Sequence, residues 1–258
     1  MRGARCAADG GIVRDTVITD APGVSSALER IAGRDIEVAS ETSVSGGCIA
    51  NGTRIELSNG AVFFVKRSGS LPSRMFVTEA AGLDALGRGT GPRVPRVYAA
   101  SESSHEAFIV MEWIAPGRKA RGFDETLGRQ LAELHRRHET ERFGFVTDNF
   151  IGSTPQPNGW MPSWFDFLRE RRIRFQVELA MDRGLVDESL RKGIERILTR
   201  LEELLPEPEH PSLLHGDLWG GNYLVDNDGF PVLIDPAVYY GHREADLAMT
   251  RLFGGFSA

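Results

Sequence analysis

The segment that most constrains this chain covers residues 212–236 and reads SLLHGDLWGGNYLVDNDGFPVLIDP. Two short apolar runs within it, 223–225 and 232–234, are joined by Asp-Asn-Asp-Gly, a composition typical of a β-hairpin turn. Asp217 lies on the loop before this hairpin, Asn222 follows five residues later, and Asp235 ends the second run. The segment therefore predicts a loop and a hairpin that carry polar side chains in a fixed order.

The order Asp, Asn, hairpin, Asp is the one that a kinase catalytic centre requires. In such a centre the first Asp accepts a proton from a hydroxyl group. The Asn and the last Asp are hard oxygen ligands that bind Mg²⁺. Each piece alone is common in many folds, but the ordered combination is specific. We therefore predict that Asp217 is catalytic and that Asn222 and Asp235 bind the metal.

Length and composition narrow the class of protein. The 258 residues, 41% of them hydrophobic, suffice for one large or two medium domains. A net charge of -6 argues against a nucleic-acid partner, and two cysteines are too few for a disulfide framework. No run approaches the roughly 18 apolar residues of a membrane span, and the start does not resemble a signal peptide. We expect a cytoplasmic protein without a membrane partner, in which residues 1–20 are a loose leader.

A glycine-rich turn lies within a predicted strand meander at residues 44–66. Gly46, Gly47 and Cys48 occupy this turn, where glycine lets backbone N–H groups approach phosphate oxygens. The turn matches neither standard nucleotide-loop pattern, so an ordinary hairpin loop is the alternative. Upstream of it, residues 25–32 predict a short helix with Ser25 as its cap and with Leu28 and Ile31 facing inward.

Lys66 and Glu79 form a predicted ion pair. Lys66 ends an apolar strand, and Glu79 lies in a helical pattern on the same face as Phe76 and Leu83. A carboxylate buried there without a partner would be costly, and Lys66 is the natural partner. In kinases a strand Lys paired to a helix Glu is placed against the α- and β-phosphates of ATP. A Glu79 side chain that reaches water is the alternative.

A hinge is predicted at residues 111–117. Two further strands, 96–99 and 107–111, lead to Met-Glu-Trp-Ile and then to the break Ala-Pro-Gly. The backbone at Glu112, Trp113 and Ile114 could then bind a flat base such as adenine. A simple strand end is the alternative.

The remainder of the chain is mainly helical in pattern, with predicted helices at 123–138, 163–184 and 187–205. The stretch 143–160 has no periodicity, so it is either a functional loop or structural cover. Four arginines at 169, 171, 172 and 174 could attract an anion, but a solvated, salt-bridged helix face is the favoured interpretation. His135 and His138 have no ligand-spaced partner, and we expect Asp246 to cap or brace the catalytic loop.

These residues together resemble the fructosamine kinase (ketosamine 3-kinase) family, in the aminoglycoside phosphotransferase-like branch of the protein-kinase fold. The most discriminating motifs are HGDLWGGN at 215–222, SGGCIA at 45–50, GSTPQPN at 152–158 and GHREADLAMTRLFGGF at 241–256. The resemblance covers roughly residues 44–256. Two departures stand out: Asp-Pro-Ala at 235–237 replaces the Asp-Phe-Gly of protein kinases, and the chain stops where relatives continue through further helices.

The resemblance implies an α/β (α+β), protein-kinase-like bilobal fold. Its antiparallel-sheet N-lobe would cover 21–114 and its mainly helical C-lobe 115–258, with a C-terminal truncation as a further expectation. It also implies ATP-dependent phosphorylation of a sugar hydroxyl of a ketosamine, free or protein-bound, which leads to deglycation. Asp217 would be the base, Asn222 and Asp235 would hold Mg²⁺, Lys66 would bind phosphate, and Glu79 would orient Lys66. Trp219 is a candidate substrate contact.

Two other functions remain open at this point: a kinase of another hydroxylated amine such as an aminoglycoside, and a truncated nucleotide-binding pseudokinase. A scaffold protein would not need these residues in this order. A monomer is expected. Cys48 adds a hypothesis of oxidation to a disulfide-linked dimer that blocks ATP, with a small apolar filler as the alternative.

Overall fold

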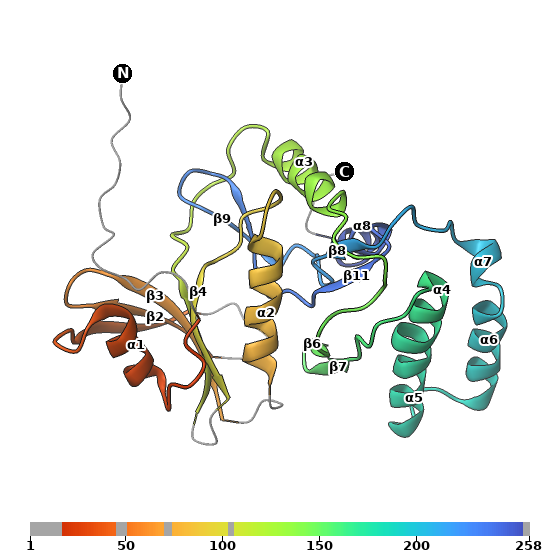
Figure 1. The fold of residues 1–258 in the computed structure, drawn as a ribbon, viewed down its shortest axis with the longest axis horizontal. Helices are drawn as coiled ribbons and strands as arrows, with labels where there is room; N and C mark the ends of the chain where they lie inside the picture. The colour runs from red at the N-terminus through yellow and green to blue at the C-terminus, as the bar shows by residue number, and fades with distance from the viewer. Residues whose placement is uncertain (1–16, 45–50, 70–73, 103–105, 255–258) are drawn as a thin grey trace.

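A five-stranded antiparallel sheet forms the first half of the described chain. The computed structural model describes residues 17–44, 51–69, 74–102 and 106–254. The sheet order is β1-β2-β3-β5-β4, and the predicted fold class is confirmed (Figure 1). Its strands are β1 (Val38–Val44), β2 (Asn51–Leu57), β3 (Val62–Ser68), β4 (Val97–Glu102) and β5 (Ala107–Glu112).

Helices α1 (Val24–Ala32) and α2 (Met75–Gly87) cover opposite faces of this sheet. Because side chains alternate along a strand, Phe108 and Val110 of β5 pack in the α1 cluster while Ile109 and Met111 pack in the α2 cluster. Leu28 and Ile31 of α1 are buried, as predicted. The predicted cap is wrong: α1 is capped by Gly23, and Ser25 lies exposed inside its first turn.

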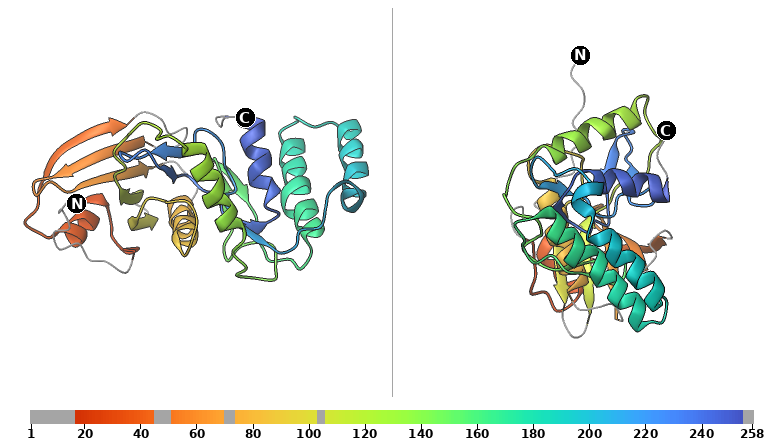
Figure 2. Two further views of the ribbon diagram at one scale, coloured as in Figure 1. Left: turned by 90° about the horizontal axis from the view of Figure 1, so that it is seen from above. Right: turned by 90° about the vertical axis from the view of Figure 1, so that its right-hand side faces the viewer.

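The second half is mainly helical, with short two-stranded pairs between the helices. Its elements are α3 (Phe123–His135), β6 (Asn149–Ile151), β7 (Thr154–Gln156), α4 (Trp164–Phe167), η1 (Leu168–Arg174), α5 (Phe175–Asp182), α6 (Glu188–Leu198), α7 (Leu201–Leu204), β8 (Ser212–Leu214), β9 (Tyr223–Val225), β10 (Pro231–Leu233), β11 (Tyr239–Gly241) and α8 (Glu244–Phe253). Helices α4 to α7 lie at the end of the molecule opposite the sheet, and α2 lies between the two parts (Figures 1 and 2).

One predicted helix changes its winding partway along and another is interrupted. The helix predicted at 163–184 consists of α4, the π-helical turn η1 and α5. The helix predicted at 187–205 breaks at residues 199–200, between α6 and α7. The stretch 143–160 is not wholly irregular, because β6 and β7 form a hairpin in it. Periodicity located these segments, but it did not predict the π-helical stretch or the break at 199–200.

The arginine cluster on η1 divides between two environments. Arg174 pairs with Glu195 at 2.8 Å on the outside, as expected of a salt-bridged face. Arg172 turns inward, where its guanidinium lies 4.5 Å from the ring centroid of Phe167 and 4.0 Å from that of Tyr239. The prediction of a solvated face is therefore wrong for Arg172, whose planar group stacks on aromatic rings.

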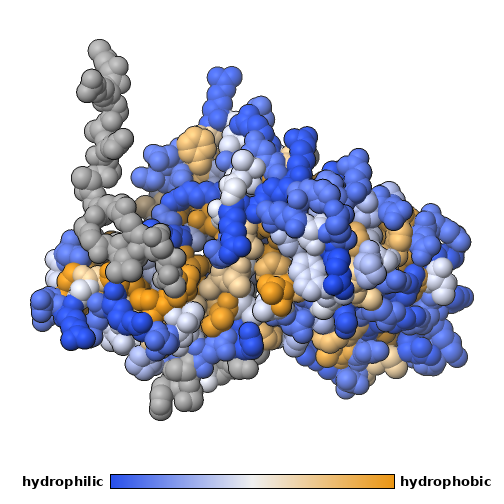
Figure 3. Space-filling model, in the orientation of Figure 1, coloured by the Kyte–Doolittle hydropathy of each residue, from blue (hydrophilic) through white to orange (hydrophobic). Residues whose placement is uncertain are grey.

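The surface is polar over most of the face shown in Figure 3, and hydrophobic side chains gather there only in patches. Within the part of the chain that the structure describes, none of the helices combines the length and the apolar character that crossing a bilayer requires.

Candidate active site

The predicted ion pair between Lys66 and Glu79 forms across the sheet–helix boundary. Lys66 Nζ on β3 lies 2.8 Å from Glu79 Oε1 on α2, and the two side chains are only 13% and 12% exposed. Burial alone would lower the pKa of Lys66, but the carboxylates of Glu79 and Asp235 outweigh it and raise that pKa. Burial raises the pKa of Glu79, which Lys66 opposes. Lys66 is thus a fixed, buried cation, and the alternative of a Glu79 that reaches water is excluded.

Asp235 also pairs with the Lys66 ammonium, although the two residues are 169 positions apart in the sequence. Lys66 Nζ donates a hydrogen bond to Asp235 Oδ1. The backbone of Asp235 has φ 55°, in the left-handed region that non-glycine residues rarely adopt. Its side chain is 36% exposed and therefore has access to a ligand.

Asp217 and Asn222 form the second cluster, on the loop between β8 and β9. Asn222 Nδ2 donates to both the backbone O and Oδ2 of Asp217, each at 2.8 Å. Burial raises the pKa of Asp217, and the nearby Asp235 adds to that effect. The backbone N–H of Ile234 donates to Asn222 O at 3.0 Å, which places Asp235 directly beside Asn222. The two clusters therefore adjoin.

Asp246 braces the catalytic loop from α8. It is buried, and its two oxygens accept hydrogen bonds from the backbone N–H groups of His215 and Gly216, both at 2.9 Å. The His135 ring lies 2.9 Å from Asp246 Oδ2. Burial opposes ionisation of Asp246, but its hydrogen bonds with His135 and the Gly216 N–H outweigh burial and lower the Asp246 pKa. The expected bracing role is thus confirmed, and His135 is a core residue.

His215 contributes two further contacts that its sequence motif did not reveal. Its Nε2 is 2.9 Å from Ile234 O, and the backbone N–H of Asp217 donates to its Nδ1 at 3.3 Å. Those partners require the neutral ring with its proton on Nε2. Burial lowers the His215 pKa and so favours this form.

Gly216 allows the catalytic loop and the Asp235 segment to touch. Its φ is 82°, and a Cβ there would lie 2.0 Å from Ala237 O. Ala237 N–H in turn donates to His215 O at 2.9 Å. Only glycine is compatible with both this conformation and this approach.

The predicted hinge residues lie at and just beyond the end of β5, whose last residue is Glu112. The Glu112 side chain faces Arg93 and accepts from Arg96 N–H at 3.3 Å, and the Glu112 N–H donates to Arg96 O at 2.8 Å, so of its polar groups only the carbonyl oxygen could serve a base. The Trp113 ring packs near Phe64 and Arg54, and Ile114 is buried. Trp219 lies on the catalytic loop beside Gly221. Gly46, Gly47 and Cys48 lie outside the described residues.

The donor set near Asp235 fits a Mg²⁺ ion. Asn222 uses its Nδ2 toward Asp217, which would leave its Oδ1 for a metal ion, and Asp235 would add a carboxylate beside it. Among the described residues, no group of three or more His, Cys, Asp or Glu could hold a metal. Mg²⁺ commonly takes one or two protein ligands together with substrate phosphates and water, and an amide oxygen with one carboxylate is a set of that kind.

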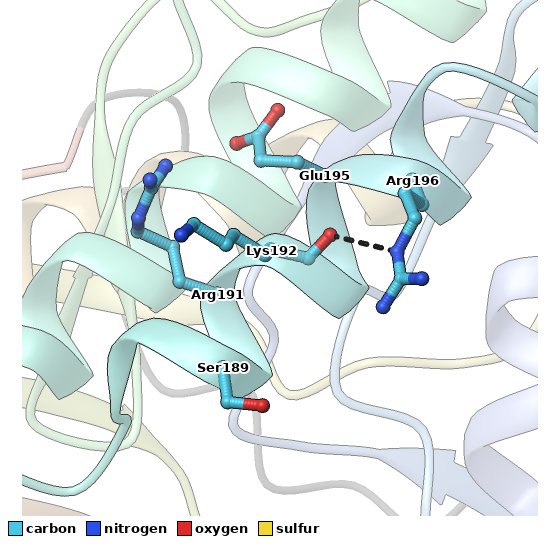
Figure 4. A pocket seen from close by; sticks show the side chains of 5 residues that line it. All are labelled: Ser189, Arg191, Lys192, Glu195 and Arg196. Carbon is cyan, nitrogen blue, oxygen red and sulfur yellow. Dashed lines mark hydrogen bonds between the residues drawn. The ribbon is translucent and has the colours of Figure 1, made fainter.

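A hollow elsewhere on the surface involves none of the predicted site residues. It is lined by Ser189, Arg191, Lys192, Glu195 and Arg196, all on α6 (Figure 4). Arg191 and Lys192 pair with Glu188, Glu195 pairs with Arg174, and Arg196 Nε donates to Lys192 O. We assign this hollow no part in the site.

The predicted site residues did not include three buried amide side chains that lie close to the segment after Asp235. Asn149, Gln156 and Asn158 are each at most 4% exposed. The sequence offered one signal, because Gln156 and Asn158 belong to the GSTPQPN motif at 152–158. That motif does not show which way its side chains point.

The sheet with its Lys–Glu pair and the helical half with its Asp217 loop define a protein-kinase-like fold. Comparison with solved structures agrees: an apo aminoglycoside phosphotransferase, APH(4)-Ia, aligns with a TM-score of 0.58 at 13% identity, over 87% of this chain and 75% of that one. At 13% identity, this similarity shows only that the two proteins share a fold.

The family is shown by closer matches. The family described as fructosamine kinase matches residues 21–258, and the chain belongs to this family. It is 38% identical to a protein of Synechocystis sp. that is named as a ketoamine kinase, over 91% of this chain and 78% of that protein. The chloroplastic protein-ribulosamine 3-kinase of Arabidopsis thaliana is 40% identical over 84% of this chain and 67% of its own length. A crystal structure assigned as a fructosamine-3-kinase from Thermobifida fusca YX-ER1 aligns with a TM-score of 0.79 at 36% identity, covering 90% and 79% of the two chains.

Proposed function

We propose that this protein is an ATP-dependent kinase that phosphorylates a sugar hydroxyl of ketosamines, the step that leads to deglycation. The observation that carries the proposal is the convergence of Lys66, Glu79 and Asp235 in one cluster directly beside Asp217 and Asn222. Relatives named ketoamine kinase and protein-ribulosamine 3-kinase support the acceptor class.

In this proposal Asp217 is the general base. Asn222 occupies Asp217 Oδ2, and no described residue donates a hydrogen bond to Asp217 Oδ1, so that oxygen can accept the proton of the acceptor hydroxyl. Burial raises the pKa of Asp217, which makes its carboxylate a stronger base. Asn222 and the braced loop fix its orientation, and phosphoryl transfer depends chiefly on such positioning.

Lys66 would bind the ATP phosphates, with Glu79 holding its ammonium in place. Bound Mg²⁺, held by Asn222 and Asp235, would neutralise phosphate charge. We include Gly46, Gly47 and Cys48 as the phosphate-side loop and the backbone of Glu112, Trp113 and Ile114 as the adenine site. The boundary between the lobes at 114–115 belongs to the same proposal.

Trp219 is the proposed ketosamine contact. It lies two residues after Asp217, and its ring packs against Gly221 at the partly exposed start of the loop. An aromatic face there would pack on the sugar or amine part of the acceptor. A monomer in the cytoplasm remains our expectation, and the Cys48 redox hypothesis stays a prediction.

The test is ATP consumption by the purified chain with ribulosamine, fructosamine and an aminoglycoside as acceptors, and with Asp217→Ala as control. Turnover with a ketosamine that is lost in Asp217→Ala supports the proposal. Turnover with the aminoglycoside alone would transfer the assignment to that acceptor class. Mg²⁺-dependent ATP binding without turnover on any acceptor would favour the nucleotide-binding pseudokinase.

A further inference from the structure

The residues that follow Asp235 are held by side chains of the β6–β7 hairpin. Asn149 Nδ2 donates to Val238 O at 2.8 Å, and Gln156 Nε2 donates to Ala237 O at 2.9 Å. Asn149 and Gln156 are directly opposite each other in the hairpin and are linked by a further bond from Gln156 Nε2 to Asn149 Oδ1 at 2.8 Å. Two buried amides thus bind two consecutive carbonyls close to the proposed metal ligand.

A second layer fixes the amides themselves. Asn158 Nδ2 donates to Asn149 Oδ1 at 2.9 Å, and Arg172 Nη2 donates to Asn158 Oδ1 at 2.7 Å. Arg172 Nη1 also donates to Pro157 O at 2.7 Å, and its guanidinium stacks over Tyr239. The network therefore runs from η1 through the hairpin to the Asp235 segment.

The other sides of this segment are also closed. Its Ala237 N–H is bonded to His215 O, and its Ala237 O lies against Gly216. On α2, a Cβ at Gly82 would lie 3.0 Å from Val238 and 3.4 Å from Pro236, so the segment packs closely on the helix that carries Glu79. A segment fixed on three sides can maintain Asp235 at its unusual φ of 55°.

We infer that the β6–β7 hairpin is a positioning element for the reaction, in which Asn149 and Gln156 hold residues 236–238 so that Asp235 stays directed toward Lys66 and the metal position. This inference rests on the proposed function for the role of Asp235. The outer partners of a metal ligand set its orientation and thereby the affinity of the site. Through Gln156 and Asn158, the GSTPQPN motif then stabilises the segment that carries Asp235, the proposed metal ligand.

The test uses Gln156→Met, which keeps the length of the side chain but removes its donor. ATP binding is measured by calorimetry with and without Mg²⁺, and backbone hydrogen exchange is followed in metal-free protein. We expect the gain in ATP affinity from Mg²⁺ to fall by about tenfold, with little change in binding of ATP alone. Exchange in residues 235–240 should accelerate. Neither readout needs an acceptor, so a failed ketosamine assay would leave this test intact.

Leu198→Ala is the control, because Leu198 is fully buried on α6 in the same apolar cluster as Val238 and Tyr239, but its side chain takes no part in the hydrogen bonds that hold residues 236–238. It should lower the melting temperature but leave the Mg²⁺ effect and exchange at 235–240 as in the original chain. If Gln156→Met behaves like Leu198→Ala in all three measurements, the hairpin is merely structural and the inference is overturned. Should Gln156→Met not fold, Asn149→Ser, which loses the bond to Val238 O, is judged by the same criteria.

Discussion

Lys66 on β3 and Glu79 on α2 are buried against each other at 2.8 Å, and the same Lys66 ammonium binds Asp235 from the second half of the chain. One cation therefore links the sheet, the helix and the segment after β10. A change at Lys66 should affect both stability and nucleotide binding, and the two effects can be separated.

Lys66→Met should destabilise the fold, because it leaves Glu79 buried without its cation. Breaking a buried pair costs about 3 kcal/mol, and protonation of Glu79 limits the cost. The double variant Lys66→Met/Glu79→Leu should regain most of that stability but no activity. Denaturant unfolding and ATP binding measure the two quantities. A double variant as unstable as Lys66→Met would contradict the pairing argument.

Asp217→Asn should remove the proposed base without disturbing the loop. We expect turnover to fall at least about 100-fold, the usual contribution of general base catalysis. The melting temperature should stay the same or rise, since the neutral amide avoids the burial penalty that raises the Asp217 pKa. ATP binding by calorimetry should persist. Asp228→Asn on the exposed β9–β10 turn is the control and should retain full turnover.

Gly216→Ala should damage both stability and activity. The added methyl would meet Ala237 O at 2.0 Å at a φ of 82°. We expect a loss of more than about 1 kcal/mol in the free energy of unfolding. Gly128→Ala is the matched control: it lies within α3 with no heavy atom within 4 Å of the new Cβ, and should stabilise by about 0.5–1 kcal/mol. Equal effects at the two glycines would refute the steric argument.

Stability should fall on mild acidification because of His215. Burial lowers its folded pKa below the unfolded value of about 6.5, so the unfolded chain binds the extra proton first. The stabilisation is complete above about pH 6.5 and is lost as the pH falls toward the folded pKa. Unfolding midpoints measured between about pH 7 and 5 should decline less steeply in His215→Gln.

His242 and Asp246 also contribute to the pH dependence of stability. Burial also lowers the pKa of His242, so a residual decline below about pH 6.5 is expected in His215→Gln. The depressed pKa of Asp246 adds stability above about pH 4 that is lost at lower pH. If the unfolding midpoint of His215→Gln declined with pH as steeply as that of the original chain, His215 would not be the cause of the loss of stability at acidic pH.

The local sequence determined much of this protein. Short continuous apolar runs located β3 and β5, helical spacing located α2, and a buried acidic position on α2 predicted the partner of Lys66. The order of Asp217, Asn222 and Asp235 predicted a site that the structure assembles from neighbouring loops. These features follow from short-range periodicity and from the high free-energy cost of burying an unpaired charge.

The tertiary structure alone decided what surrounds those residues. The inward turn of Arg172 toward Tyr239 and the hydrogen bonds of the Asn149 and Gln156 amides depend on partners far away in the chain. Polar side chains carry no periodic signal that shows whether they face water or a buried carbonyl. Their direction is set by which backbone groups lack partners once the elements have packed, and that is a property of the assembled fold.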